Sequence, residues 1–287
     1  MNTDVLSTRQ VATLLGVGEA TVKRWADAGE IDCFRTPGGH RKFRLRDVTS
    51  FVQTRQYETP GVLPEAAPPG AGEPGEAAIE HFKAAALRGE AAALVAQLSG
   101  MRLRGYQLAT LFDEVVAPAL QRIGAEWEKR SLSIAEEHVA SQAVLDAIAR
   151  SQPLAEPPGE PVRPDRGTAI VAAVAGEQHD IAARMAACLL RARGFEVLAP
   201  LAQTPARDLA DLVLRSRASL VVLTSTVANG VDEQVRLAVA AANQTGGRVV
   251  VGGSGMRKAT LPPEARLLTS LRELDEESEA AGRRRAR

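Results

Sequence analysis

The stretch that decides the fold is TAIVAAVAGEQHDIAARM, residues 168–185. It begins with an uninterrupted apolar run, which ends at Gly176, Glu177 and His179, and apolar residues then return at helical spacing. This pattern predicts a buried parallel strand that leads through a loop into a helix. Because open α/β sheets bind ligands beyond the carboxyl ends of their strands, His179 is placed where a ligand would lie. The alternative is a loop histidine that caps the next helix or faces solvent.

Strand and helix patterns continue to alternate after this stretch, which predicts a doubly wound parallel sheet of the flavodoxin or Rossmann kind. The predicted strands cover residues 168–175, 196–201, 219–226 and 248–252, with a weaker strand at 266–269. The predicted helices cover 180–193, 206–217 and 231–244, and a short final helix follows. We assign this domain to residues 163–275 and expect the tail, 276–287, to be disordered. No G-x-G-x-x-G or P-loop follows any of these strands, which disfavours a nucleotide-binding domain.

The composition limits the class of protein. A chain of 287 residues with 45% hydrophobic content can form two or three cores. Lysine plus arginine and aspartate plus glutamate balance at 35 each, so any binding of nucleic acid must depend on a local basic patch. Cys33 and Cys188 have no metal-ligand spacing, and no apolar run is long enough to cross a membrane. We therefore expect a cytoplasmic protein that is not bound to a membrane.

Residues 1–57 predict a winged helix-turn-helix domain. Ser7 and Gln10 can form a capping box before a first helix, and EATVKRWADAG gives a second helix that stops at Gly29. Two short helices joined by a glycine-containing turn are typical of helix-turn-helix domains. The Pro37-Gly38-Gly39 turn that follows predicts a hairpin, or wing.

Basic residues gather on the second helix and on the wing of this segment. A recognition helix in the major groove, with a basic wing over the backbone, would bring such residues to DNA phosphates. His40 either touches a phosphate or packs on the hairpin. The predicted DNA-contacting residues are Lys23, Arg24, Arg35, His40, Arg41 and Lys42.

The middle of the chain predicts a flexible linker followed by a helical bundle. Residues 58–76 are rich in proline, glycine, alanine and glutamate and cannot form a core. Residues 77–152 have helical periodicity, and we expect four helices of which the third is interrupted by Pro118.

Three polar or aromatic residues of the bundle stand out. Glu137 and His138 follow Trp127 after nine intervening residues, beside an expected inward stripe that includes Ile134 and Val139. Considered alone, Trp127 is a core residue and His138 a surface or interhelical histidine.

Nearly the whole chain resembles the CarH/LitR family of cobalamin-dependent, light-sensing repressors, in the order DNA-binding domain, helical bundle, cobalamin-binding domain. The segments VATLLGVGEATVKRWADAGEI and TPGGHRKF resemble MerR-type winged helix-turn-helix regulators. Trp127, Glu137 and His138 match the family's W-x9-E-H motif. Glu177 and His179 match the E-x-H-x-x-G motif of cobalamin-binding domains, with an alanine in place of its last glycine.

The resemblance implies that the helical bundle caps a cofactor, most specifically adenosylcobalamin. His179 would ligate cobalt from below, in place of the cofactor's own benzimidazole, while Trp127 and Glu137 would cover the upper adenosyl group. Light would break the cobalt–carbon bond, and a bundle histidine would then ligate the emptied face. Glu128 occupies the position directly after the tryptophan, where the family can have that histidine, so His138 is the nearest candidate. The other cofactor contacts that the resemblance implies are Glu177, Thr224, Thr226, Gly252 and Gly253.

The resemblance also implies a transcription regulator rather than an enzyme. Family members assemble as tetramers in the dark, bind operator DNA and come apart in light, so we expect a homo-oligomer, dimer or tetramer, that represses transcription. The alternative from another functional class is a corrinoid carrier of the methyltransferase kind, which would need catalytic partner domains.

Three departures from the family pattern concern the channel that holds the nucleotide tail of cobalamin. Ala182 and Leu201 replace glycines, and Thr224 replaces a serine. Three hypotheses follow: adenosylcobalamin in a reshaped tail pocket, a tail-less tetrapyrrole such as heme ligated by His138 and His179, or no cofactor. The first is our leading expectation.

Overall fold

The computed structural model describes residues 5–36, 38–44, 47–48, 51, 74–103, 106–155, 166–227 and 230–283. The chain forms two compact units, Met1–Val162 and Arg163–Arg287. Most of the predicted linker, residues 58–73, lies outside the described residues. No helix in the described part of the chain is long and apolar enough to cross a lipid bilayer.

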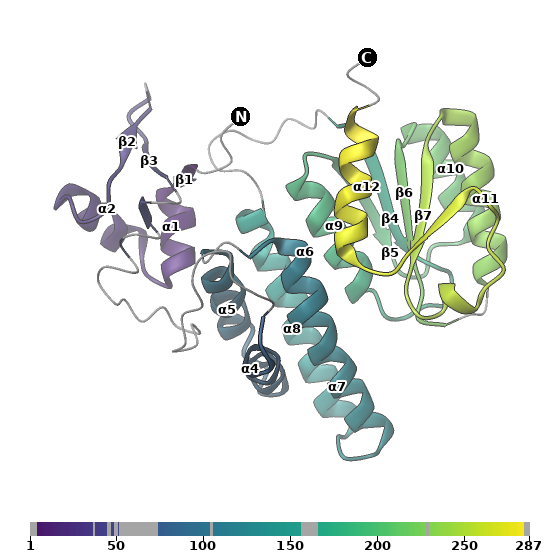
Figure 1. The fold of residues 1–287 in the computed structure, drawn as a ribbon, viewed down its shortest axis with the longest axis horizontal. Coiled ribbons are helices and arrows are strands. Elements are labelled where there is room, and N and C mark those ends of the chain that lie inside the picture. Colours follow the sequence, from purple (N-terminus) through teal and green to yellow (C-terminus); the bar gives the residue numbers. More distant parts are fainter. Residues whose placement is uncertain are drawn as a thin grey trace. The chain divides into compact units, whose positions relative to one another are not determined.

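The first unit begins with the predicted helix-turn-helix and wing. Helices α1 (Thr8–Leu15) and α2 (Glu19–Asp27) are followed by the hairpin β2 (Phe34–Arg35) and β3 (Arg41–Arg44). The capping box is present, since the Ser7 amide donates to Gln10 Oε1 at 2.8 Å and the Gln10 amide donates to Ser7 Oγ at 3.3 Å. A strand that the sequence pattern did not predict, β1 (Val5–Ser7), pairs with β3 and completes an antiparallel sheet of order β1-β3-β2 (Figure 1).

The helical part of the first unit consists of α4 (Glu76–Leu87), α5 (Ala91–Leu103), α6 (Leu108–Leu111), α7 (Ala117–Glu128) and α8 (Ile134–Ala155). Helix α4 begins at Glu76, a residue that we had assigned to the linker. Near Pro118 the third helix is interrupted in its α-helical hydrogen-bond pattern, but the chain stays helical there. A π-helical turn, η1 (Phe112–Val116), joins α6 to α7 without a break. Proline crowds the carbonyl four residues earlier, here Glu114 in η1, and the wider π turn accommodates this ring.

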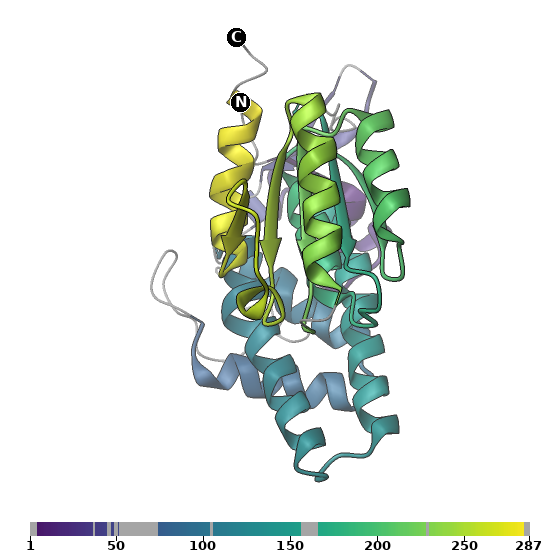
Figure 2. The same ribbon diagram turned by 90° about the vertical axis from the view of Figure 1, so that its right-hand side faces the viewer.

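The second unit is a parallel sheet of β4 (Thr168–Ala173), β5 (Glu196–Leu201), β6 (Leu220–Thr224), β7 (Arg248–Gly252) and β8 (Ala265–Leu268). The strand order is β5-β4-β6-β7-β8, which is the flavodoxin-like arrangement. Helices α10 (Ala206–Ser216) and α11 (Val231–Thr245) cover one face, and α9 (Ile181–Ala192) covers the other (Figures 1 and 2). From β4 the chain passes to β5 on one side, and the later strands β6, β7 and β8 lie on the other side of β4. The topological switch point therefore lies between β4 and β6.

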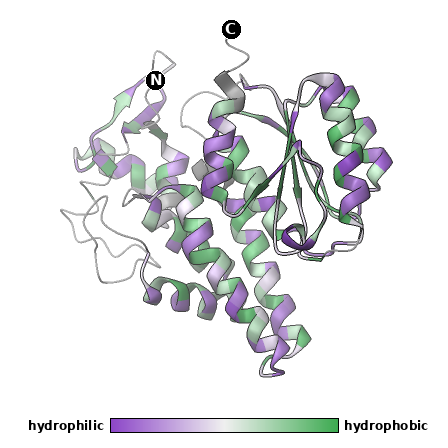
Figure 3. Cartoon of the chain, turned by 45° about the vertical axis from the view of Figure 1, so that its right-hand side comes forward, coloured by the Kyte–Doolittle hydropathy of each residue, from purple (hydrophilic) through white to green (hydrophobic). Residues whose placement is uncertain are grey.

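Alternation along the strands builds the core of this unit. Every second residue of β4 and β6, including Ile170, Ala172, Val221 and Leu223, packs against α10 and α11. Figure 3 shows the hydrophobic colour concentrated on the strands and on the helix sides that face them. A sheet buried on both faces explains why these strands read as continuous apolar runs.

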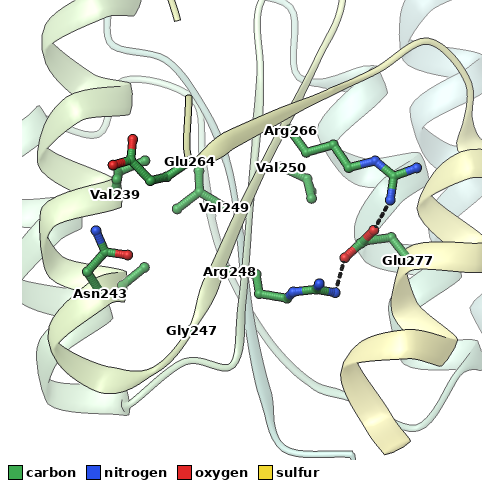
Figure 4. Close-up of a pocket in the computed structure, with 10 residues that line it drawn as sticks. Val239, Asn243, Gly247, Arg248, Val249, Val250, Glu264, Arg266 and Glu277 are labelled. Carbon is green, nitrogen blue, oxygen red and sulfur yellow. Dashed lines mark hydrogen bonds and ion pairs between the residues drawn. The ribbon is translucent and has the colours of Figure 1, made fainter. Parts of the chain in front are cut away.

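The disordered tail predicted from residue 276 is wrong up to Arg283. The final helix, α12 (Leu271–Arg283), lies beside α9 and covers the end of the sheet at β8. Glu277 is 5% exposed and forms ion pairs with Arg248 and Arg266, at a pocket near the amino ends of β7 and β8 (Figure 4). These pairs join residues distant in sequence, whereas our prediction considered only the charge-rich composition of the tail itself.

Candidate cofactor site and nucleic-acid interface

Two loops meet at the switch point of the sheet. Ala173, the last residue of β4, pairs with Thr224, the last residue of β6. The loops that continue from these strands carry Glu177 and His179 on one side and Thr226 on the other. Both loops therefore leave the sheet at the same edge, where doubly wound domains bind their ligands.

A buried carboxylate joins the two loops. Glu177 is 1% exposed, and its Oε2 accepts hydrogen bonds from the amide and the hydroxyl of Thr226 at 2.6 and 2.5 Å. Its Oε1 accepts the His179 amide at 2.8 Å and lies 2.9 Å from His179 Nδ1. The predicted residues Glu177, His179 and Thr226 thus form one connected group.

The hydrogen bonds keep this carboxylate ionised. Burial alone would raise the pKa of Glu177, but the hydrogen bonds from Thr226 and His179 outweigh it and lower the pKa to about 2. An ionised carboxylate only accepts, so Nδ1 of His179 carries the proton that points at it. The imidazole is 69% exposed, and Nε2 is its other ring nitrogen, the one not bonded to Glu177. A carboxylate that orients a metal-binding histidine in this way is a recurrent arrangement.

The ends of β6 and β7 supply the remaining predicted contacts. The Thr224 hydroxyl is buried and has no hydrogen-bond partner in the described part of the chain, so it can bond to a bound molecule. Gly253 has φ +105°, and a Cβ there would lie 2.2 Å from the Ser225 carbonyl oxygen. A Cβ on Gly252 would meet only the Leu268 carbonyl, at 3.6 Å. Contacts within the protein therefore exclude a side chain at Gly253 but not at Gly252.

The loops after β6 and β7 are bonded to each other at several points. The Gly255 amide donates to the Ser225 carbonyl at 3.0 Å, and the Ser254 hydroxyl donates to the Thr226 carbonyl at 3.1 Å. A Cβ on Gly255 would lie 2.1 Å from the Val227 carbonyl oxygen, so backbone meets backbone there too. The two loops pack as one layer.

A supporting residue that the sequence analysis missed is Gln234. It is fully buried in α11, and its Oε1 accepts the Ala175 amide at 2.6 Å, which holds the start of the loop that carries His179. The signal available in the sequence was a glutamine on the apolar face of a helix, where a polar side chain needs a specific partner.

Leu201 has a backbone conformation that suits glycine. It ends β5 with φ +60°, in the left-handed region, and the pairing of β4 with β5 shifts register just before it. A branched side chain therefore occupies a backbone conformation that glycine adopts without strain. Ala182, in the first turn of α9, is half-buried.

The bundle residues Trp127, Glu137 and His138 belong to the first unit. Trp127 is 45% exposed near the end of α7, and His138 is 73% exposed with Nε2 at 3.7 Å from Glu137 Oε2. The Ser141 hydroxyl donates to Glu137 Oε1 at 2.5 Å. The interpretation of Trp127 as a core residue is therefore wrong. Of the expected inward stripe, Ala143 is buried, but Ile134 is 62% and Val139 is 47% exposed, so the prediction is wrong for these two residues.

The predicted DNA-contacting residues fall into three groups. Lys23 and Arg24 are exposed on α2, and Arg35 and His40 are exposed on the wing. Lys42 is half-buried on the opposite face of β3 from Phe43, where Arg44 lies over the Phe34 ring at 5.8 Å. Arg41 is mostly covered and forms an ion pair with Asp27.

Family models match three parts of the chain. A helix-turn-helix domain matches residues 5–56, and two different B12 binding domain models match residues 78–151 and 167–263. The HTH-type transcriptional repressor CarH of Myxococcus xanthus is 28% identical over 245 residues, which cover 77% of this chain and 79% of CarH. The transcriptional repressor DcmR of Methylorubrum extorquens is 39% identical over 54 residues, which are 18% of this chain and 20% of DcmR.

Among solved structures, the monomethylamine corrinoid protein of Methanosarcina barkeri has a TM-score of 0.55 at 13% identity, covering 71% of this chain and 97% of its own. At this identity the likeness concerns the fold alone. It agrees with a helical region followed by a parallel α/β sheet. The order of the three matched domains and the length of the match to CarH identify the chain as a homologue of the CarH-type cobalamin-binding transcriptional regulators.

Proposed function

We propose that this protein is a transcriptional repressor whose binding to operator DNA is gated by adenosylcobalamin, with light as the signal. The observation that carries the proposal is the Thr226–Glu177–His179 group at the switch point of the sheet. A buried carboxylate fixes an exposed imidazole there, in a chain that also carries a helix-turn-helix domain.

The residues of the α/β unit fit a corrinoid by their donor chemistry. His179 Nε2 is a nitrogen ligand of the kind cobalt accepts, and Glu177 fixes its orientation. The Thr224 hydroxyl, which has no hydrogen-bond partner among the described residues, can bond to a polar group of the bound molecule, and Gly252 leaves room beside it. When bound, adenosylcobalamin would supply a cobalt centre and a light-sensitive cobalt–carbon bond.

The bundle would cover the other side of the cofactor. The exposed Trp127 ring offers an apolar surface for an adenosyl group, and Glu137 offers hydrogen-bond acceptors. His138 carries the exposed imidazole of the bundle motif. It would be the residue that ligates cobalt when the cofactor has lost its adenosyl group.

The first unit would bind double-stranded operator DNA. Lys23 and Arg24 on α2, with Arg35 and His40 on the wing, present positive or donor groups at one end of the domain. We propose a cytoplasmic homo-oligomer, dimer or tetramer, which would read repeated half-sites. The DNA-binding domain favours regulation over the alternatives of an enzyme or a corrinoid carrier.

The test is an absorption spectrum of the purified chain after dark incubation with adenosylcobalamin and, separately, with hemin. We expect a retained cobalamin spectrum that changes on illumination, and loss of duplex DNA binding in a gel shift after the same illumination. His179→Ala should abolish retention in the dark. His138→Ala should alter only the illuminated spectrum, and His81→Ala, a half-buried bundle histidine, should match the wild type.

Other spectra would contradict the proposal in distinct ways. If both His179→Ala and His138→Ala keep the wild-type spectrum, the ligand assignment is wrong. A sharp Soret band with hemin and no retained cobalamin would mean that the sheet holds a tail-less tetrapyrrole instead. Retention of neither would leave a regulator without this cofactor.

A further inference from the structure

An ion pair connects the wing to the second helix of the DNA-binding domain. Arg41 begins β3, Asp27 ends α2, and Arg41 Nη2 donates to Asp27 Oδ1. The Arg41 side chain is 19% exposed and that of Asp27 is 58% exposed. A guanidinium covered to this extent presents little surface to a DNA backbone.

Strand register explains why Arg41 points toward α2. Residues two apart on a strand share a face, and Phe43 on β3 is fully buried in the core of this domain. Arg41 therefore lies on the inward face of the wing. Arg35, its cross-strand partner on β2, lies on the same face but is exposed, so the two arginines differ in how far they are covered.

The position of Asp27 is unfavourable for an unpaired carboxylate. It lies at the carboxyl end of α2, where the helix dipole repels negative charge, and it follows the exposed Lys23 and Arg24 on the same helix. A free anion beside them would also repel DNA phosphates. The ion pair with Arg41 offsets both effects.

The wing itself is small. Its hairpin pairs through Phe34–Lys42 and Arg35–Arg41, and its turn is closed by the Gly39 amide donating to the Thr36 carbonyl at 2.8 Å. Strand β3 is held to the domain by its pairing with β1 and by the buried Phe43, so the turn between Arg35 and Arg41 is the part of the wing farthest from these contacts. A link to α2 from Arg41, the first residue of β3 after this turn, would therefore set where the end of the wing lies.

We propose that the Asp27–Arg41 pair is a clamp that sets the wing against the second helix, so that Arg41 is a positioning residue and Arg35 makes the phosphate contact. This inference rests on the proposed DNA-binding function and replaces our expectation that Arg41 contacts phosphate itself. Arg41 acts on DNA only through the placement of the wing.

The test measures binding of the full chain to a mixed-sequence DNA duplex over a series of salt concentrations. Asp27→Asn removes a negative charge near DNA, so charge alone predicts tighter binding. The clamp predicts the opposite, weaker binding by about threefold to fivefold with an unchanged slope of log affinity against log salt. Arg41→Ala should have the same effect, and the double variant should be no weaker than either single variant.

Two control variants separate positioning from direct contact. Glu19→Gln neutralises an exposed acid at the other end of α2 and should leave affinity equal or higher. Arg35→Ala should lower affinity and reduce the salt slope by about 0.9, as loss of one phosphate contact does. Equal or tighter binding by Asp27→Asn, or a reduced slope for Arg41→Ala with additive effects, would overturn the clamp.

A measurement without DNA keeps the two proposals distinct. Amide hydrogen exchange of residues 39–44 should be faster in Asp27→Asn than in the wild type and unchanged in Glu19→Gln. Unchanged exchange in Asp27→Asn would refute the clamp whatever happens with DNA. Absence of salt-dependent duplex binding by the wild-type chain would instead refute the proposed function.

Discussion

At the scale of single residues, Glu177 links stability to the orientation of His179. Its pKa is lowered to about 2 from an ordinary value of 4.5, so the folded state favours the ionised form. A group with a lowered folded-state pKa contributes stability above its unfolded pKa and loses that contribution as the pH falls toward the folded value. The window for Glu177 therefore runs from about pH 4.5 down to about 2.

Glu177→Gln should lower the free energy of unfolding near pH 7 by about 3 kcal/mol, the value of a pKa shift of this size. It should also remove part of the loss of stability between pH 4.5 and pH 3. Urea unfolding at several pH values measures both effects. Glu264→Gln, at an exposed acid of the same unit, is the control. An unchanged pH profile in Glu177→Gln would show that this carboxylate is not held ionised by the fold.

At Leu201 we expect a glycine variant to be more stable than an alanine variant, which is the reverse of their usual order in a strand. The φ of +60° at Leu201 costs about 1 kcal/mol for any residue with a Cβ and nothing for glycine. We therefore expect Leu201→Gly to be more stable than Leu201→Ala by roughly 1 kcal/mol in thermal or urea unfolding. At Leu198, a regular position of the same strand, glycine should be the less stable of the two. Greater stability of the alanine variant at both positions would contradict the left-handed assignment.

At the scale of elements, α12 depends on charge as well as on apolar packing. Leu274 is its buried apolar residue, while Asp275 pairs with Arg193 and Glu277 pairs with Arg248 and Arg266. Because the two arginines that meet Glu277 are 39% and 59% exposed, water can solvate them when the carboxylate is removed.

Glu277→Gln should therefore destabilise the second unit by about 1–2 kcal/mol, less than the loss of a fully buried pair. Hydrogen exchange should rise first in the amides of α12. Glu276→Gln, the exposed neighbour in the same helix, should change neither quantity. Equal effects of the two substitutions would mean that the ion pairs do not hold the helix.

At the scale of the whole molecule, features with a short-range signal were predictable. Apolar runs and helical spacing gave the strands and helices of the second unit, and glycine and capping residues gave the helix-turn-helix. The sequence pattern placed Glu177 and His179 in the loop after the first strand of this sheet, but the hydrogen bond between them was not predicted. Alternation of strands and helices predicted a doubly wound parallel sheet, but it did not distinguish the flavodoxin strand order from the Rossmann order.

Features that depend on distant partners were not predictable from local patterns. Helix α12 needs Arg193, Arg248 and Arg266 from other elements, and strand β1 needs β3. The buried role of Gln234 depends on a loop far away in the sequence. Leu201 has a left-handed backbone conformation, which branched side chains rarely adopt. A leucine at this position therefore predicts an ordinary extended residue.

The interlocked loops after β6 and β7 have a mechanical consequence. Gly253 and Gly255 lie against the backbone of Ser225 and Val227, and the Ser254 hydroxyl donates to the Thr226 carbonyl. Thr226 is in turn bonded through Glu177 to the loop that carries His179. A shift of one of these loops would therefore displace its neighbour, since close-packed backbone does not compress. A molecule that moves the His179 imidazole would thus also move the three connected loops. Any group bound at that edge of the sheet would then be displaced by the shift of all three loops rather than by that of a single side chain.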